Sequence, residues 1–117
     1  MNNLSNFSFL VSFFKRAIAW KSVTNGIYRK ALMYIKQSKI YKIENEKDPL
    51  NNIEAYNFYW EPIKSYNKTV RIVRIVIFYD DDNKIKDVRT FCNCDGFKKY
   101  KVCSHILATY IKLKSTR

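Results

Sequence analysis

The stretch FCNCDGFKKYKVCSH, residues 91–105, contains all three cysteines of this 117-residue chain and its only histidine. Their spacing is Cys92-x-Cys94, eight residues, and then Cys103-x-His105. Three thiolates and one imidazole are four ligands, which is the complete tetrahedral shell of a structural zinc site. Soft sulfur ligands with an imidazole favour zinc, and four protein ligands leave no position open for a substrate. The spacing therefore predicts one structural zinc ion, bound by these four residues.

The residues around the ligands indicate the local structure that would hold them. In a strand, residues i and i+2 face the same side, so we expect the two cysteines of the first pair to project together from a strand. The Cys-x-His pair precedes an apolar periodic run, which places it on the opening turn of a helix. There the positive end of the helix dipole helps to keep a thiolate ionised. Asp95 and Gly96 are expected to form the turn that leaves the strand, with Gly96 free to take a positive φ.

Three other interpretations of these residues stay open from the sequence. Inert buried cysteines would be expected within apolar runs, whereas these thiols flank polar and charged residues. A disulfide between Cys92 and Cys94 would be strained, and it is disfavoured in a reducing compartment. A nucleophilic Cys–His pair would need an oxyanion site, for which the sequence gives no signal. Zinc is the favoured interpretation.

Upstream of the cysteines, the chain predicts strands. Residues 69–80 are rich in Val and Ile, and residues 80–83 are expected to close a hairpin into the segment that carries Cys92. Pro62 and the turn-forming residues 48–52 separate the earlier segments. The expected strands are residues 38–46, 53–61, 69–80 and 84–94.

Helices are expected towards both ends of the chain. Residues 24–37 begin with Thr24 or Asn25 as a cap, and a terminal helix starts at Cys103. Residues 4–20 carry two apolar stripes, so we expect a core helix, with self-association or docking on a partner protein as the alternative. The order of elements predicts an α+β fold: N-terminal helices, an antiparallel β-meander of about four strands, a zinc knuckle and a C-terminal helix.

The net charge of +12 favours a polyanionic partner, with nucleic acid first and an anionic membrane surface second. A lysine-rich composition also arises from codon bias or from solubility alone. Lysines between the two ligand pairs alternate with Phe97 and Tyr100, so they could contact phosphates while a ring stacks on an exposed base. The alternatives are aromatic packing over the zinc site and a solvated lysine face. The candidate nucleic-acid contacts are Lys98, Lys99, Lys101, Tyr100, Arg71 and Arg74.

The pattern Cys-Asn-Cys, eight residues, Cys-Ser-His, set between a β-hairpin and a C-terminal helix, resembles the SWIM-type zinc finger. The close resemblance covers about 35 residues, and a vaguer similarity reaches back to Ile27. The segment Trp60-Glu61-Pro62 departs from the family pattern, because it lacks the small Gly-Ser turn of many relatives. On this resemblance, residues 1–117 are a single SWIM-like domain, with an apolar N-terminal helix in residues 1–25 and an α-β-β-β-β-zinc-α core in residues 26–117.

The resemblance implies a module found in transposases, chromatin-remodelling ATPases, ubiquitin-ligase-like proteins and recombination mediators, where it is taken to bind DNA or other proteins. For this chain it implies one structural zinc ion and binding to nucleic acid, DNA ahead of RNA. The alternative is a protein–protein adaptor, for example of a recombinase or of a second copy, that uses residues 4–20. Fold alone does not decide between these tasks.

We expect a binding module and not an enzyme, because the only histidine is used as a zinc ligand. The three aspartates at residues 80–82 are most simply a solvated hairpin tip, with a hard-metal nuclease site as the minor alternative. The apolar segment 6–14 has no positive region before it, and Lys15 and Arg16 end it short of the length that spans a membrane. The expectation is a cytoplasmic protein without a transmembrane segment or secretory signal.

Overall fold

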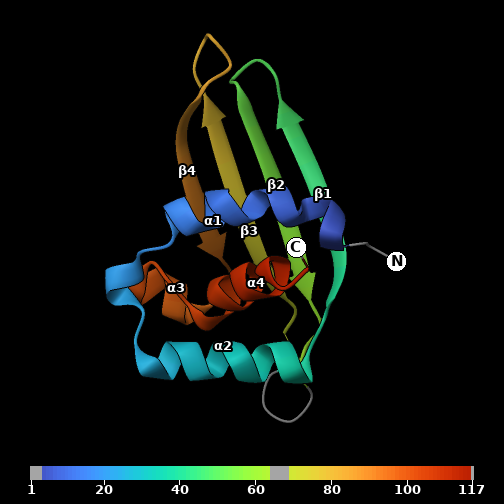
Figure 1. Ribbon diagram of the computed structural model, residues 1–117, viewed down its shortest axis with the longest axis vertical. Coiled ribbons are helices and arrows are strands. Elements are labelled where there is room, and N and C mark those ends of the chain that lie inside the picture. Colours follow the sequence, from blue (N-terminus) through green and yellow to red (C-terminus); the bar gives the residue numbers. More distant parts are fainter. Residues whose placement is uncertain (1–3, 64–68, 117) are drawn as a thin grey trace.

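The N-terminal and C-terminal helices cross one face of a single antiparallel sheet, and the helix over Asn25–Gln37 lies at the end of the strands against the C-terminal helix, which gives a two-layer α+β architecture (Figure 1). The computed structural model describes residues 4–63 and 69–116. The chain runs from N-terminal helices through four consecutive strands to a C-terminal helix. The α+β fold class expected from the sequence is therefore confirmed.

The sheet is a meander in which each strand pairs with the next along the chain, in the order β1-β2-β3-β4. All three pairings are antiparallel. The register places Val73 of β3 opposite Phe58 on one side and opposite Cys92 on the other. Cys92, the first predicted zinc ligand, therefore lies at the edge of a row of buried residues that runs across the sheet from Phe58 through Val73. The strands are β1 (Ile40–Asp48), β2 (Ile53–Trp60), β3 (Arg71–Tyr79) and β4 (Ile85–Cys92).

The N-terminal segment is not the single helix over residues 4–20 that the apolar stripes predict. Leu10, at the start of its α-helical part, makes no side-chain capping bond, and Ile18 has extended backbone that ends the helix. Aromatic residues are only moderate helix formers, and a segment this short depends on tertiary packing for its stability. The segment divides into the 3-10 helix η1 (Leu4–Leu10), the α-helix α1 (Val11–Ala17) and the 3-10 turn η2 (Trp20–Ser22).

The later helices begin close to the predicted positions. Thr24 caps the second helix, and its side-chain oxygen accepts a hydrogen bond from the backbone N–H of Ile27 at 3.2 Å. Cys103 precedes the terminal helix as expected. The residues after Cys94 were expected to form a turn and loop, but they make one short helix. The bounds are α2 (Asn25–Gln37), α3 (Asp95–Tyr100) and α4 (Ser104–Lys114).

Helix α4 lies between α1 and α2 in the helical layer (Figure 1). It packs against both helices and against β3 and β4. The helix that begins at the zinc ligands is therefore a central core element. Its buried residues are Ile106, Leu107, Ala108, Thr109, Tyr110 and Leu113.

The N-terminal segment uses its apolar residues in the core of its own domain. Phe14 is fully buried, and its ring lies 5.9 Å from the ring of Phe58 on the sheet. Phe7 contacts the same ring edge-on at a centroid distance of 6.3 Å. Among the large apolar residues in the described part of the segment, only Phe9 and Trp20 are markedly exposed. The core-helix interpretation therefore accounts for most of the apolar stripe.

One buried hydrogen bond joins the sheet to α4. The indole Nε1 of Trp60 donates to Thr109 Oγ1 at 2.9 Å, and the Thr109 hydroxyl donates to the carbonyl oxygen of His105 at 2.8 Å. Trp60 and Thr109 are both fully buried. A buried donor that loses its acceptor carries a desolvation penalty. This bond therefore helps to specify how the zinc-binding helix sits on the sheet.

We expect Thr109→Val to lower the free energy of unfolding by about 1–3 kcal/mol, because the Trp60 N–H would stay buried without an acceptor. Urea melts would measure the change. Thr116→Val is the matched control, since its hydroxyl donates to the Leu113 carbonyl at 2.8 Å near the end of the same helix, where the residue is only half-buried. Equal losses of unfolding free energy in the two variants would show that the Trp60–Thr109 hydrogen bond contributes no more than an ordinary hydroxyl hydrogen bond.

Candidate metal centre

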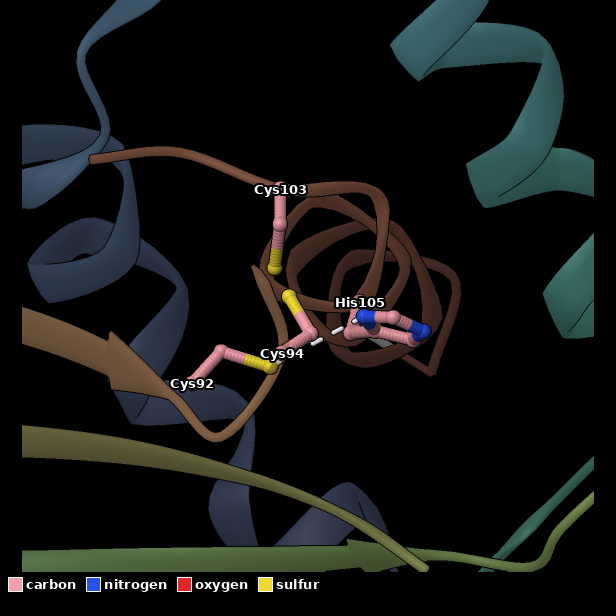
Figure 2. A group of neighbouring side chains, drawn as sticks. All are labelled: Cys92, Cys94, Cys103 and His105. Atoms are coloured by element: carbon pink, nitrogen blue, oxygen red, sulfur yellow. Dashed lines mark hydrogen bonds between the residues drawn. The ribbon is translucent and has the colours of Figure 1, made fainter. Parts of the chain in front are cut away.

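The four predicted ligands come from three neighbouring pieces of backbone. Cys92 is the last residue of β4, and Cys94 is the N-cap residue of α3. Cys103 is the N-cap residue of α4, and His105 lies in its first turn. Their ligand atoms all lie within 4.8 Å of one another, and the three cysteines are buried. Figure 2 shows the four side chains converging from the strand end, the following loop and the start of α4.

The spacing of these atoms fits a tetrahedral zinc shell. Zinc bonds of about 2.3 Å to sulfur and about 2.0 Å to nitrogen place neighbouring ligand atoms roughly 3.5–3.8 Å apart. The distance from Cys92 Sγ to His105 Nδ1 is 3.7 Å, which already has this value (Figure 2). Nδ1 is therefore the imidazole nitrogen that faces the shell, and small side-chain movements close the rest of it. The four residues form one site for a single zinc ion.

The backbone between the ligands differs from the expected strand and glycine turn. The strand ends at Cys92, so Cys94 projects from a helix N-cap with extended backbone and not from the strand itself. Gly96 does not have a positive φ; the left-handed residue is Lys101, at φ 61° after α3. A β-carbon at Gly96 would meet Cys103 Cβ at 3.7 Å, which is ordinary contact. The reversal that returns the chain to the zinc therefore occurs at Lys101.

Hydrogen bonds of Asn93, which lies between the first two ligands, connect the site to the start of β3. Its side-chain nitrogen donates to the carbonyl oxygen of Val70 at 3.0 Å, and its side-chain oxygen accepts from the backbone N–H of Ile72 at 3.0 Å. The Asn93 carbonyl oxygen also accepts a hydrogen bond from Arg71 Nη1 at 3.3 Å. This amide continues the strand pairing past the end of β4, so it fixes the direction in which the cysteine pair leaves the sheet.

His105 is also held from the side of α2. The ring of Tyr34 lies edge-on to the imidazole, with a centroid distance of 4.6 Å, and it lies edge-on to Trp60 at 5.3 Å. Tyr34 is itself buried. Outer contacts of this kind orient a metal ligand and reduce its freedom before the metal binds. The sheet and two helices therefore position the one histidine of the chain.

The three thiols interact strongly because they lie so close together. Hydrogen bonds from Cys103 and Cys92 hold the pKa of Cys94 far below its ordinary value. Hydrogen bonds with the other two sulfurs, together with burial, raise the pKa of Cys103. The bond with Cys103 lowers the pKa of Cys92, but the bond with Cys94 and burial outweigh it and raise that pKa to about 12. Zinc must therefore displace protons from Cys92 and Cys103, so binding is expected to release protons.

Three buried thiols and one imidazole in a closed shell define a structural zinc finger of the Cys-Cys-Cys-His class. The SWIM zinc finger family model matches residues 75–114, which run from the middle of β3 to the end of α4. These residues therefore constitute a SWIM zinc finger domain, as the ligand spacing predicts. Searches of curated proteins and of solved structures gave no match.

The structure gathers only part of the predicted nucleic-acid surface. Lys98 and Lys99 are exposed on α3, and Lys101 is exposed directly after it. Arg71 lies beside the zinc centre on the covered side of the sheet, whereas Arg74 lies on the opposite face. There Arg74 Nη1 pairs with Glu46 at 2.5 Å and donates to Asn57 at 3.0 Å, so it is separated from the others. The side chain of Tyr100 lies outside the described residues.

Two residues of the site gave no clear signal in the sequence. Asn93 is a polar residue at a strand end, which looks like a turn residue until its two bonds to the β3 backbone are seen. Tyr34 reads as one of several apolar residues on the inner face of α2. Both act through contacts between segments far apart in the chain, and residue spacing does not report such contacts.

The sequence predicts no transmembrane segment, and the helices of the structure can be compared with that prediction. None of the helices that the structure describes is both long enough and apolar enough to cross a bilayer.

Proposed function

We propose that this SWIM module binds nucleic acid, DNA ahead of RNA, through the basic surface of its helical layer and without reading sequence. The observation that carries the proposal is the separation of charge between the two layers. The described residues of the helical segments, 4–37 and 95–116, contain eleven Lys or Arg and a single acid, Asp95. The described residues of the sheet region, 38–63 and 69–94, contain eight Lys or Arg and nine acids. Nearly all of the excess positive charge therefore belongs to the helical segments, on the zinc side of the sheet.

The pairing of the charges supports the same assignment. Among the described residues, five of six ion pairs lie in the sheet region, for example Lys42 with Glu44 and Arg74 with Glu46. The sixth joins Lys98 to Asp95 at 3.9 Å, and both side chains are highly exposed. An exposed pair at this distance contributes little and is readily exchanged for a phosphate. Lys98 is therefore open to a phosphate, whereas five cations of the sheet are paired with its own acids: Lys39, Lys42, Lys47, Arg74 and Arg89.

The lysines near the zinc sit on a well-defined piece of backbone. Lys98 and Lys99 belong to α3, which is tied at its start to Cys94 and at its end to the left-handed Lys101. The ring of Phe97 is half-buried, lies 5.9 Å from the ring of Phe91, and has the Lys101 ammonium 5.8 Å from its centre. This supports packing for Phe97, as opposed to base stacking. Lysines held in this way contact phosphates and position a strand, but they do not distinguish bases.

The adaptor alternative has less support. It requires the aromatic segment 4–20 to offer its apolar side chains to a partner. Leu10, Phe14 and Ile18 are instead buried within this domain. The exposed Phe9 and Trp20 are single residues, which are common on the surfaces of proteins. We therefore place nucleic-acid binding ahead of an adaptor role.

We further propose that the module binds without catalysing a reaction. Four protein ligands complete the coordination of zinc, so the metal has no open position at which to activate water. The aspartate cluster is organised as a turn, because Asp80 Oδ1 accepts hydrogen bonds from the backbone N–H groups of Asp82 and Lys84, both at 2.9 Å. A carboxylate used in this way supports the hairpin tip and leaves the hard-metal alternative without positive evidence.

A salt titration of DNA binding tests the proposal. Fluorescence anisotropy with a labelled oligonucleotide should give affinity that falls steeply as salt rises, since each phosphate contact releases bound counterions. Replacing Lys98, Lys99 and Lys101 together with Gln should weaken binding at least about tenfold and flatten the salt dependence. Different sequences of equal length should bind within a fewfold of one another.

The matched control removes the same charge from the sheet. Lys39, Lys42 and Lys47 pair with Glu61, Glu44 and Glu54 respectively, so their triple Gln variant has the same net charge as the α3 variant. We expect this control to bind within about threefold of the unmodified protein. Equal losses in both triple variants would assign binding to overall charge alone. No binding to DNA or RNA at low salt would overturn the proposed function.

A further inference from the structure

A cavity of about 520 Å³ lies between α2, the zinc centre and the start of β3. Its size falls within the range of pockets that hold small organic ligands. Three of the zinc ligands form part of one wall, so the remaining walls decide what else could enter. Six of these lining residues bear on its chemistry: Ile27, Lys30, Tyr34, Arg71, Val102 and Ser104.

The cavity has an apolar side and a cationic side. Ile27, Tyr34 and Val102 supply aliphatic and aromatic surface, and Tyr34 and Val102 are buried. Lys30 is exposed, and Arg71 is half-buried, so one cation lies towards solvent and the other deeper. An apolar wall beside two cations suits a ligand with a flat, weakly polar part and a phosphate.

Arg71 has a polar atom that its protein neighbours do not satisfy. Its Nη1 donates to the Asn93 carbonyl oxygen at 3.3 Å, but its Nε is buried and has no hydrogen-bond partner among the residues that the structure describes. Buried donors in proteins are nearly always paired, so the surrounding residues satisfy this guanidinium incompletely. Because Nε itself has almost no exposed surface, a ligand in the cavity would reach the terminal nitrogens of this guanidinium, which match phosphate oxygens well.

One acid also borders the cavity. Asp95 lines it, but its side chain is fully exposed, and its carboxylate pairs with Lys98 at 3.9 Å. A solvated carboxylate that already has a cationic partner opposes an anion only weakly, since exposed charges are screened by water and salt. Lys30 and Arg71 are therefore the two cations that would bind an anion here, and they also face the net negative charge of the zinc centre in the neighbouring wall.

We infer that this cavity takes one nucleotide of a single-stranded nucleic acid, with the phosphate between Lys30 and Arg71 and the base against the apolar side. The inference rests on the proposed nucleic-acid function and adds a binding mode to it. A base paired in a duplex cannot leave its stack without the loss of pairing and stacking energy, whereas a single strand offers its bases freely. The cavity therefore confers a preference for single strands that lysines on a surface do not.

The test compares a fluorescein-labelled ten-nucleotide oligothymidylate with the duplex that it forms with its complement. The unmodified protein is expected to bind the single strand about tenfold more tightly. Lys30→Met should remove most of this preference, weakening the single strand about tenfold and the duplex no more than about threefold. Ile27→Ala should weaken the single strand severalfold without changing the salt dependence, because it removes apolar contact and no charge.

Lys36→Met is the matched control, since it removes the same charge from an exposed position of α2 that does not line the cavity. It should affect both probes alike and by no more than about threefold. If Lys30→Met and Lys36→Met have equal effects on both probes, the cavity is not a nucleotide site, although the proposed function stands. Binding of neither probe by the unmodified protein overturns both.

Arg71 requires one further measurement because it lies beside the metal. Three thiolates around Zn²⁺ leave the centre with a net negative charge, which a neighbouring guanidinium would also stabilise. Arg71→Met should weaken the single strand about tenfold while the protein keeps one zinc per chain. Loss of zinc with unchanged single-strand binding by the remaining zinc-loaded fraction would assign Arg71 to the metal centre and overturn its role in the cavity.

Discussion

Removal of zinc is expected to unfold the whole domain and not only the segment that carries the ligands. Structural zinc contributes on the order of 10 kcal/mol in small motifs, which is comparable to the total stability of a domain. The metal joins the end of β4 to the starts of α3 and α4. Because α4 packs on α1, α2 and two strands, its release would expose the core on several sides.

Two measurements check this expectation. A chelator added during thermal melting should abolish the cooperative transition, and returning zinc should restore it with one metal bound per chain. Cys103→Ser and His105→Ala should behave like the chelated protein, and the chelator should have no further effect on them. A metal-free protein with an unchanged melting temperature would refute a structural role for zinc. Unfolding confined to α3 and α4, seen by hydrogen exchange, would show that the core survives without them.

The metal ligands were predictable from sequence because zinc places strong limits on ligand number and type. Four scarce residues in Cys-x-Cys and Cys-x-His pairs leave few alternatives, and neither pair depends on distant segments. The meander was predictable for a related reason, since each strand pairs with the next one along the chain. In both cases the information is local in the sequence.

The errors arose where backbone geometry depends on contacts across the fold. Gly96 looks like a turn residue in isolation, but the chain makes a helix there and reverses at Lys101. The surroundings of Arg71 and Arg74 also depend on distant contacts, although the sequence already places the two residues on opposite faces of the strand. An odd separation in a strand puts two residues on opposite faces. The partners then differ, because Arg74 meets Glu46 on the open face, whereas Arg71 lines the cavity beside the zinc.

The same non-local contacts couple the core to the metal. Trp60 on β2 donates to Thr109, and Thr109 donates to the carbonyl oxygen of His105. Tyr34 on α2 touches both the indole and the imidazole edge-on. A change at Trp60 therefore acts on His105 by two routes, one through a hydrogen-bonded hydroxyl and one through an aromatic contact. Neither route was visible in the sequence, where Trp60 is 45 positions from His105.

We expect Trp60→Ala to lower the free energy of unfolding by about 3–5 kcal/mol, because the indole is fully buried and its removal leaves a large cavity. The variant should also bind zinc more weakly, since Tyr34 and Thr109 lose the group that positions them against His105. Urea melts and competition with a chromogenic chelator would measure the two effects.

Trp20→Ala is the control for this prediction. Trp20 is 44 % exposed, its indole N–H donates to the Lys15 carbonyl oxygen at 2.8 Å, and its ring touches Tyr110. Its removal should lower the free energy of unfolding by no more than about 1–2 kcal/mol, because a half-exposed ring buries less surface than Trp60 does. Zinc affinity should be unchanged, because Trp20 is not part of the contacts through Thr109 and Tyr34 that reach His105. If Trp60→Ala lost stability but kept full zinc affinity, the contacts through Thr109 and Tyr34 would stabilise the fold without affecting the affinity of the site for zinc.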